Sequence, residues 1–137
     1  MSQAVIDVCN NWPEFQLQAM HLGLRMVEAD QDHVVNESRA TEFNRLSGYV
    51  PGFVLLGLAE LTAGGLANYD SYERHGALVF EWFATEQTTS FLGNTRAPIV
   101  TCESRWAVRG DSESVIDTTI KDGGRTLLHA TSTHRKR

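Results

Sequence analysis

The chain has 137 residues, of which 42% are hydrophobic and 21% are charged, which is enough for one globular domain with its own core. Its formal net charge is −5 and it has no broad stripe of Lys and Arg, which argues against nucleic acid as the main partner. We expect an N-terminal helical segment, residues 1–20, followed by a single domain, residues 21–137.

Cysteine usage and hydropathy indicate the compartment. Cys9 and Cys102 form no CxxC or Cys/His spacing, and the five histidines show no ligand spacing, so no disulfide framework and no metal site are expected. The N-terminus lacks the pattern of a signal peptide, and the longest apolar run, residues 53–67, is too short for a membrane span. These features predict a soluble cytoplasmic protein without a membrane span or a cofactor.

The N-terminal half predicts, in chain order, a short helix, a β-hairpin, an irregular segment and a long helix. The short helix is expected at residues 3–20, broken near 10–13, and the β-hairpin at 21–40, around a polar turn at 30–32. The irregular segment is expected at 41–50, with a turn at Ser47-Gly48, and the long helix at 53–68. Pro51 suits the first turn of the long helix, where its missing N–H has no helical acceptor.

The C-terminal half predicts a polar loop followed by an antiparallel meander. The loop is expected at residues 70–76 and the β-like segments at 78–92, 98–109, 112–121 and 126–134. Asp122-Gly123-Gly124 indicates a hairpin turn before the last strand, and the basic tail, residues 135–137, is expected to fray. The fold class is therefore α+β, with one apolar helix wrapped by a curved antiparallel sheet.

The long helix candidate, FVLLGLAELTAGGLAN, contains a single ionisable side chain, Glu60. A carboxylate among so many apolar neighbours loses hydration, which raises its pKa and is costly unless it has a partner or a function. At about 100° per residue, the face around Glu60 consists of Phe53, Leu56, Gly57, Ala63, Gly64 and Ala67. These mostly small residues let a ligand or another backbone approach. A glutamate paired with an arginine, or at a solvent edge, is the alternative.

Three segments of the chain form a recognisable combination. They are NRLSGYVPGFVLLGLAE at 44–60, Thr89-Ser90-Phe91-Leu92 followed by Pro98, and DGGRTLLHAT at 122–131. In this order and spacing they resemble the hotdog fold, in particular its acyl-CoA thioesterase-like branch. The family has an acidic residue eight positions after a glycine at the helix start, and Gly52 and Glu60 have this separation. The chain departs from the family at Pro51, where the family has His, and at Phe53, where it has a second Gly.

The resemblance implies a hydrolase that cleaves an acyl thioester. Glu60 would act as base or nucleophile, and the backbone N–H of Gly52 or Phe53 would face the thioester oxygen. Asn44 would hold the water or the carbonyl through its amide. Substrate-binding candidates are Phe53, Gly57, Gly64, Thr85 and Thr88, together with Arg96 and the basic tail, which would meet CoA phosphates.

The resemblance also implies a homodimer or homotetramer with acyl pockets between subunits, in which Glu60 works near Thr85 or Thr88 of the other chain. The expected partner is acyl-CoA or another acyl thioester. A non-catalytic hotdog module that binds an acyl thioester or serves dimerisation stays open, because the family's His and second Gly are missing. An enoyl-thioester hydratase or dehydratase ranks third, because Tyr49 and Val50 cannot replace the histidine of those enzymes.

Overall fold

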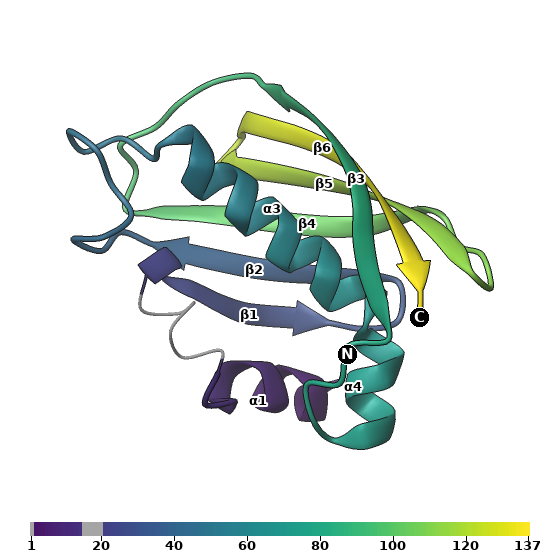
Figure 1. Cartoon of the computed structure of the whole chain (residues 1–137). Coiled ribbons are helices and arrows are strands. Elements are labelled where there is room, and N and C mark those ends of the chain that lie inside the picture. Colours follow the sequence, from purple (N-terminus) through teal and green to yellow (C-terminus); the bar gives the residue numbers. More distant parts are fainter. Residues whose placement is uncertain (1, 15–20) are drawn as a thin grey trace.

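In a computed structural model that describes residues 2–14 and 21–137, a six-stranded antiparallel sheet curves around one long helix (Figure 1). The strand order is β1-β2-β4-β5-β6-β3, so β1 and β3 form the two edges. The helices are α1 (Gln3–Asn11), α3 (Gly52–Ala67) and α4 (Tyr69–His75). The strands are β1 (Leu24–Ala29), β2 (His33–Arg39), β3 (Trp82–Phe91), β4 (Ile99–Val108), β5 (Glu113–Asp122) and β6 (Arg125–Lys136). The expected α+β architecture is confirmed.

Helix α3 lies across the concave face of the sheet, as expected for the apolar run. Pro51 occupies the N-cap position, and its carbonyl accepts the first helical hydrogen bonds, from the N–H groups of Val54 and Leu55. Three glycines weaken a free helix by about 1 kcal/mol each relative to alanine, so packing must hold α3 in place. The side chains that pack toward the sheet include Val54, Leu55, Leu58, Thr62 and Leu66.

The N-terminal helix α1 closes the core beneath β1. Val5, Ile6 and Cys9 are buried in the core cluster at the C-terminal half of α3. The side-chain amide of Asn10 pairs with both backbone polar groups of Met26, at 2.9 Å each. Hence α1 pairs with the edge of β1 as well as packing on it.

The polar loop predicted at residues 70–76 is wrong, because residues 70–75 belong to helix α4. Tyr69 and Tyr72, three residues apart and on one face, are both buried and anchor α4 to the core. Gly76, at a φ of +62°, ends the helix in the left-handed conformation. Two buried tyrosines thus outweigh the polar composition that indicated a loop.

The turn predicted at Ser47-Gly48 is confirmed. Both residues have positive φ, +52° and +84°, and Leu46 and Tyr49 exchange backbone hydrogen bonds across them. The Arg96 guanidinium lies 5.3 Å from the centre of the Tyr49 ring, and a Cβ at Gly48 would come within 2.9 Å of its Nε. Glycine at position 48 therefore permits the positive φ of the turn and leaves room for the Arg96 side chain that stacks on Tyr49.

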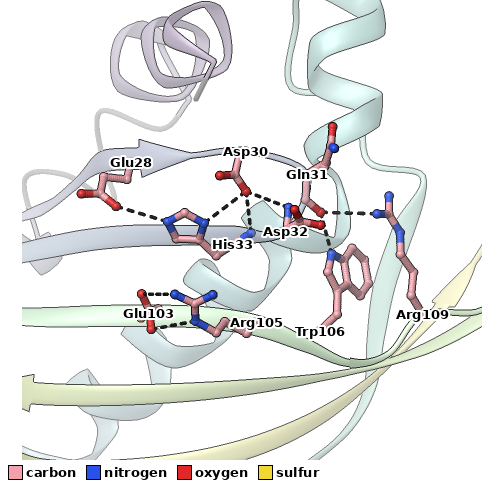
Figure 2. A network of polar contacts seen from close by, with 9 residues as sticks. All are labelled: Glu28, Asp30, Gln31, Asp32, His33, Glu103, Arg105, Trp106 and Arg109. Atoms are coloured by element: carbon pink, nitrogen blue, oxygen red, sulfur yellow. Dashed lines mark hydrogen bonds and ion pairs between the residues drawn. The ribbon is translucent and has the colours of Figure 1, made fainter.

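The turn between β1 and β2 is held by a polar network (Figure 2). The Asp30 carboxylate accepts hydrogen bonds from the backbone N–H groups of Asp32 and His33. Desolvation by burial raises the pKa of Asp30, but the two backbone hydrogen bonds and the His33 ring together outweigh it, so the pKa is lowered. The carbonyl of Gln31 accepts from the Trp106 indole at 2.8 Å, which connects the turn to β4.

The basic tail is part of the sheet, so the expected fraying is wrong. Strand β6 continues to Lys136, and the N–H of Arg137 donates to the carbonyl of Glu81 at 2.8 Å. The Arg135 guanidinium pairs with Glu113 at 3.1 Å. Within residues 2–14 and 21–137, no helix has the length and apolar character needed to cross a membrane.

Candidate functional site

A cavity of about 410 Å³ lies beside the C-terminal half of α3. Helix α3 contributes Glu60, Leu61, Gly64 and Gly65 to its lining. The other walls come from α1, α4, β1 and β2, the first residues of β3 and the end of β6, together with Glu14, Asn68, Leu78 and Phe80 from the connecting segments. Of the predicted site residues, the cavity brings together Glu60 and Gly64. Arg137 of the predicted basic tail also belongs to the lining, and the other predicted residues lie outside it.

The carboxylate of Glu60 is exposed, which differs from the expected loss of hydration. Within the described part of the chain, no ion pair or hydrogen bond engages this carboxylate. Glu60 is therefore not paired with an arginine of the described residues, and in a single chain it lies at an edge exposed to solvent. From that edge Glu60 faces both solvent and the cavity that it lines.

Asn36 is a buried polar residue of the cavity that the sequence analysis missed. It is 2% exposed, and its Nδ2 donates to Thr62 Oγ1 at 3.0 Å. The Thr62 hydroxyl in turn donates to the carbonyl of Leu58 at 2.7 Å. The Oδ1 atom of Asn36 has no hydrogen-bond partner among the described residues. The sequence contained a signal for this position, because Val34, Asn36 and Ser38 are every second residue of β2 and therefore share its inward face.

His134 is a second buried polar residue that lines the cavity, and sequence reasoning assigned it no such place. A hydrogen bond of 2.8 Å joins its Nε2 to Ser132 Oγ on the inner face of β6. Burial lowers the pKa of His134, because the charged ring would lose its hydration. The ring is therefore neutral near pH 7.

The start of α3 lies away from the cavity, with Gly52 and Phe53 both exposed. The Phe53 side chain is 71% exposed, and a Cβ at Gly52 would lie 3.5 Å from the Phe91 ring. Glu60 follows Gly52 by eight residues, so at 1.5 Å per residue the two are about 12 Å apart along the axis. Within one chain they do not reach the same carbonyl group.

Asn44 holds the loop that precedes α3. Its side chain is fully buried, with Oδ1 accepting from the N–H of Thr41 and Nδ2 donating to the carbonyl of Arg39, both at 2.9 Å. The Arg45 guanidinium donates to the same Oδ1 at 2.9 Å. The structure thus gives the amide a structural role away from Glu60, which is the turn role that asparagine commonly has in loops.

The two threonines predicted near the site lie on edge strand β3. Thr88 pairs with Thr131, so it faces away from α3, because residues directly opposite in a sheet share a face. Thr85 lies in a β-bulge between Ala84 and Glu86, and its hydroxyl donates to the carbonyl of Thr133 at 3.3 Å. The residues of β3 that face α3 are instead Ala84, Gln87, Thr89 and Phe91.

The remaining predicted residues occupy separate places. Gly57 faces Leu22, whose side chain a Cβ would meet at 3.7 Å, and Arg96 stacks on Tyr49 near the start of α3. Arg137 of the basic tail, by contrast, lines the cavity and lies 5.4 Å from the centre of the Phe83 ring. Among the described residues, no group of three His, Cys, Asp or Glu side chains is placed to hold a metal ion.

No protein-family model matches the sequence, and comparison with curated proteins finds no match. Solved structures do share the architecture. The PaaI protein of the Escherichia coli phenylacetic acid degradation operon is 18% identical with a TM-score of 0.78, over 99% of this chain and 95% of that one. A Haemophilus influenzae thioesterase is 16% identical with a TM-score of 0.74, over 96% and 86%.

A third similar structure contains a ligand. It is a hypothetical thioesterase of Streptococcus pneumoniae with coenzyme A, 17% identical with a TM-score of 0.69, over 82% of this chain and 87% of that one. Identities this low relate the chains by fold, and the chemistry of this chain must be argued from its own residues.

Proposed function

We propose that this chain, which has the hotdog fold of these thioesterases, is itself a hydrolase of acyl thioesters. One observation carries the proposal. Glu60, the only ionisable side chain of α3, lies exposed at a cavity of about 410 Å³ that is otherwise lined largely by apolar groups. Such a cavity suits an acyl group, and a carboxylate beside it suits attack on the bond that joins the acyl group to sulfur.

The reaction is acyl transfer to water. Glu60 either removes a proton from water, whose oxygen then attacks the thioester carbonyl carbon, or attacks that carbon itself to form a mixed anhydride that water hydrolyses. In both routes the carbon–sulfur bond breaks and the leaving thiolate takes up a proton. Backbone N–H groups at a helix start stabilise the oxyanion that forms on the carbonyl.

We further propose that two chains complete each site. Gly52 and Glu60 are about 12 Å apart along α3, so an antiparallel pair of α3 helices related by a two-fold axis near Leu56 would bring Glu60 of one chain to the helix start of the other. Exposed apolar side chains on this face, Phe53 at 71% and Leu56 at 38%, support such pairing. Strand β3 adds an unpaired edge beside them.

Coenzyme A is the proposed carrier of the acyl group. Arg137 lines the cavity that Glu60 also lines and stacks on Phe83, so it offers a positive charge to a phosphate beside the proposed reaction centre. Arg96 lies near the start of α3 and would serve the site that the second chain completes. A cytoplasmic location would supply such substrates.

The test is thiol release from a panel of short, long and aromatic acyl-CoAs, with Glu60→Gln measured beside the wild type. We expect kcat to fall by roughly 10²- to 10⁴-fold in the variant, the usual effect of a positioned proton-transfer group. Glu73→Gln is the matched control, because Glu73 is exposed on α4 and lies outside the cavity. Equal rates in a folded Glu60→Gln variant would remove Glu60 from the mechanism.

A non-catalytic module that binds an acyl thioester is the second candidate, and Phe53 favours it. Its exposed side chain stands at the helix start, where the related enzymes have a glycine that admits the substrate carbonyl. Tight binding of an acyl-CoA by the wild type without any thiol release would decide for this candidate.

A further inference from the structure

We propose that a second pocket, separate from the cavity at Glu60, binds a small zwitterion such as a free α-amino acid. The carboxylate of the ligand would pair with Lys136 and its ammonium group with Asp111, both of which line this pocket. Among the described residues, Trp82 alone lines both the pocket and the cavity. The inference goes beyond the proposed function, because it does not depend on the hydrolysis of a thioester.

The pocket has a volume of about 240 Å³ and lies at the C-terminal end of α3, with α4 as one of its walls. The sheet provides another wall. Trp106 lies opposite the buried Ile116, and Lys136 lies opposite Trp82, so the members of each pair share a face of the sheet. Pockets for drug-sized ligands measure about 300 to 1,000 Å³, so this pocket suits a smaller molecule.

Most of the charged side chains in the lining already have partners within the protein. They form two ion pairs, Arg109 with Asp70 and Arg74 with Glu81. Within the described part of the chain, no ion pair or side-chain hydrogen bond engages the other two charged groups, Lys136 and Asp111. A ligand that carries one charge of each sign therefore complements the charges that the ion pairs leave over.

Lys136 and Asp111 lie on adjoining segments. The N–H of Lys136 donates to the carbonyl of Ser112 at 3.0 Å, so the end of β6 contacts the turn that carries Asp111. The hydrogen bond from Arg74 is the main cause of the lowered pKa of Glu81, and the charge of Lys136 contributes to it, which puts the ammonium group near a carboxylate of the lining. An α-amino acid carries both of its charges on one carbon atom, which matches two groups on adjoining segments.

Two tryptophan rings offer contact to the carbon skeleton of such a ligand. Trp82 and Trp106 are partly buried and pack against the core cluster. The Arg109 guanidinium lies 4.7 Å from the centre of the Trp106 ring (Figure 2), whereas no cation of the described residues lies over Trp82. An aliphatic side chain of the ligand could therefore cover the Trp82 ring.

The experiment compares L-leucine with two analogues, 4-methylpentanoate, which lacks the ammonium group, and 3-methylbutylamine, which lacks the carboxylate. Their dissociation constants for the wild type are measured by calorimetry. We expect L-leucine to bind more tightly than either analogue by about tenfold or more, because each analogue leaves one charge of the pocket without a partner. Intrinsic fluorescence is a second readout, since Trp82 and Trp106 line the pocket.

Substitutions of the two unpaired charges test the assigned contacts. Lys136→Met and Asp111→Asn should each weaken the binding of L-leucine by about tenfold or more, and both residues are exposed, so the core is left intact. Lys121→Met and Asp32→Asn are the matched controls, because they remove exposed charges outside the lining. The controls should bind L-leucine as the wild type does.

Glu60→Gln should also bind L-leucine as the wild type does, because Glu60 lies outside this pocket. Weaker binding by Glu60→Gln would assign the amino acid to the cavity and overturn the inference. No binding of L-leucine, equal affinity for the three molecules, or binding unchanged by Lys136→Met and Asp111→Asn would overturn it as well. None of these measurements involves thiol release, so a failure of the proposed hydrolysis would leave this result unaffected.

Discussion

At the scale of single residues, two asparagines show how neighbours decide a side chain's role. Both amides are buried. Asn44 uses Oδ1 and Nδ2 within its own loop, whereas Asn36 uses Nδ2 on Thr62 and keeps Oδ1 unpaired at the cavity. Asn44 was the predicted site residue because it matches a family motif. Such a match does not show whether the amide oxygen and nitrogen already have hydrogen-bond partners.

His134 should make stability depend on pH. Burial lowers the pKa of His134 below that of an unfolded chain, about 6.5. Below that pH the His134 side chain binds a proton in the unfolded state but not in the folded state. The contribution of neutral His134 to the free energy of unfolding is therefore complete above about pH 6.5 and is lost as the pH falls toward the folded pKa. We expect the wild-type Tm to fall between pH 7.5 and pH 5.5, measured by thermal melts.

His134→Gln should show a smaller fall of Tm over the same range, and His75→Gln, at an exposed position on α4, should retain the wild-type fall. Carboxylates with lowered pKa, such as Asp30 and Asp122, lose their contribution at lower pH and leave this window clear. An identical pH dependence in His134→Gln would contradict the assignment.

At the scale of elements, β3 shows how one bulge changes which side chains meet a site. A regular strand places alternate residues on one face, so Thr85 and Thr88, three apart, were never on the same face of an unbroken strand. The bulge between Ala84 and Glu86 resets the alternation, and Gln87 and Thr89 face α3 instead. Composition does not reveal where a strand inserts an extra residue.

The two adjacent glycines of α3 should respond differently to alanine. A Cβ at Gly64 would enter open space, whereas a Cβ at Gly65 would lie 3.3 Å from the terminal methyl of Met26. Alanine in a helix is favoured over glycine by about 1 kcal/mol. We therefore expect Gly64→Ala to raise the free energy of unfolding by about that amount, and Gly65→Ala to gain less because Met26 must move.

Urea melts at constant m-value measure both changes. Because Gly64 lines the cavity, the same substitution should weaken binding of the longer acyl-CoAs in the proposed site. A stabilisation at Gly65 that equals or exceeds the one at Gly64 would show that Met26 yields freely.

At the scale of the whole molecule, α3 is apolar nearly all round while the sheet covers only one of its sides. A helix of this kind is normally buried throughout. The exposed side chains Phe53, Leu56 and Phe91, beside the open edge of β3, therefore argue for a second chain.

We expect the wild type to elute as a dimer or a dimer of dimers in size-exclusion chromatography with light scattering, and Phe53→Glu to shift toward the monomer, because a charge at the contact loses its hydration there. Val108→Glu is the matched control, since Val108 is also an exposed apolar residue, 60% exposed, at the end of β4. Thiol release should fall with Phe53→Glu if two chains complete each site. A monomeric wild type would reject the two-chain site.

The sequence by itself determined the order of most elements, because apolar periodicity and turn residues act over short stretches of chain. It predicted the hairpin, the long helix and the meander of β4, β5 and β6, but β3 pairs with β6 instead of joining that meander beside β4. It also missed α4, whose two tyrosines became decisive only against the core. Tertiary structure alone decided that Glu60 is exposed, that Asn44 is occupied and that Asn36 lines the cavity. Those outcomes depend on partners brought together from distant parts of the chain, and local patterns do not specify such partners.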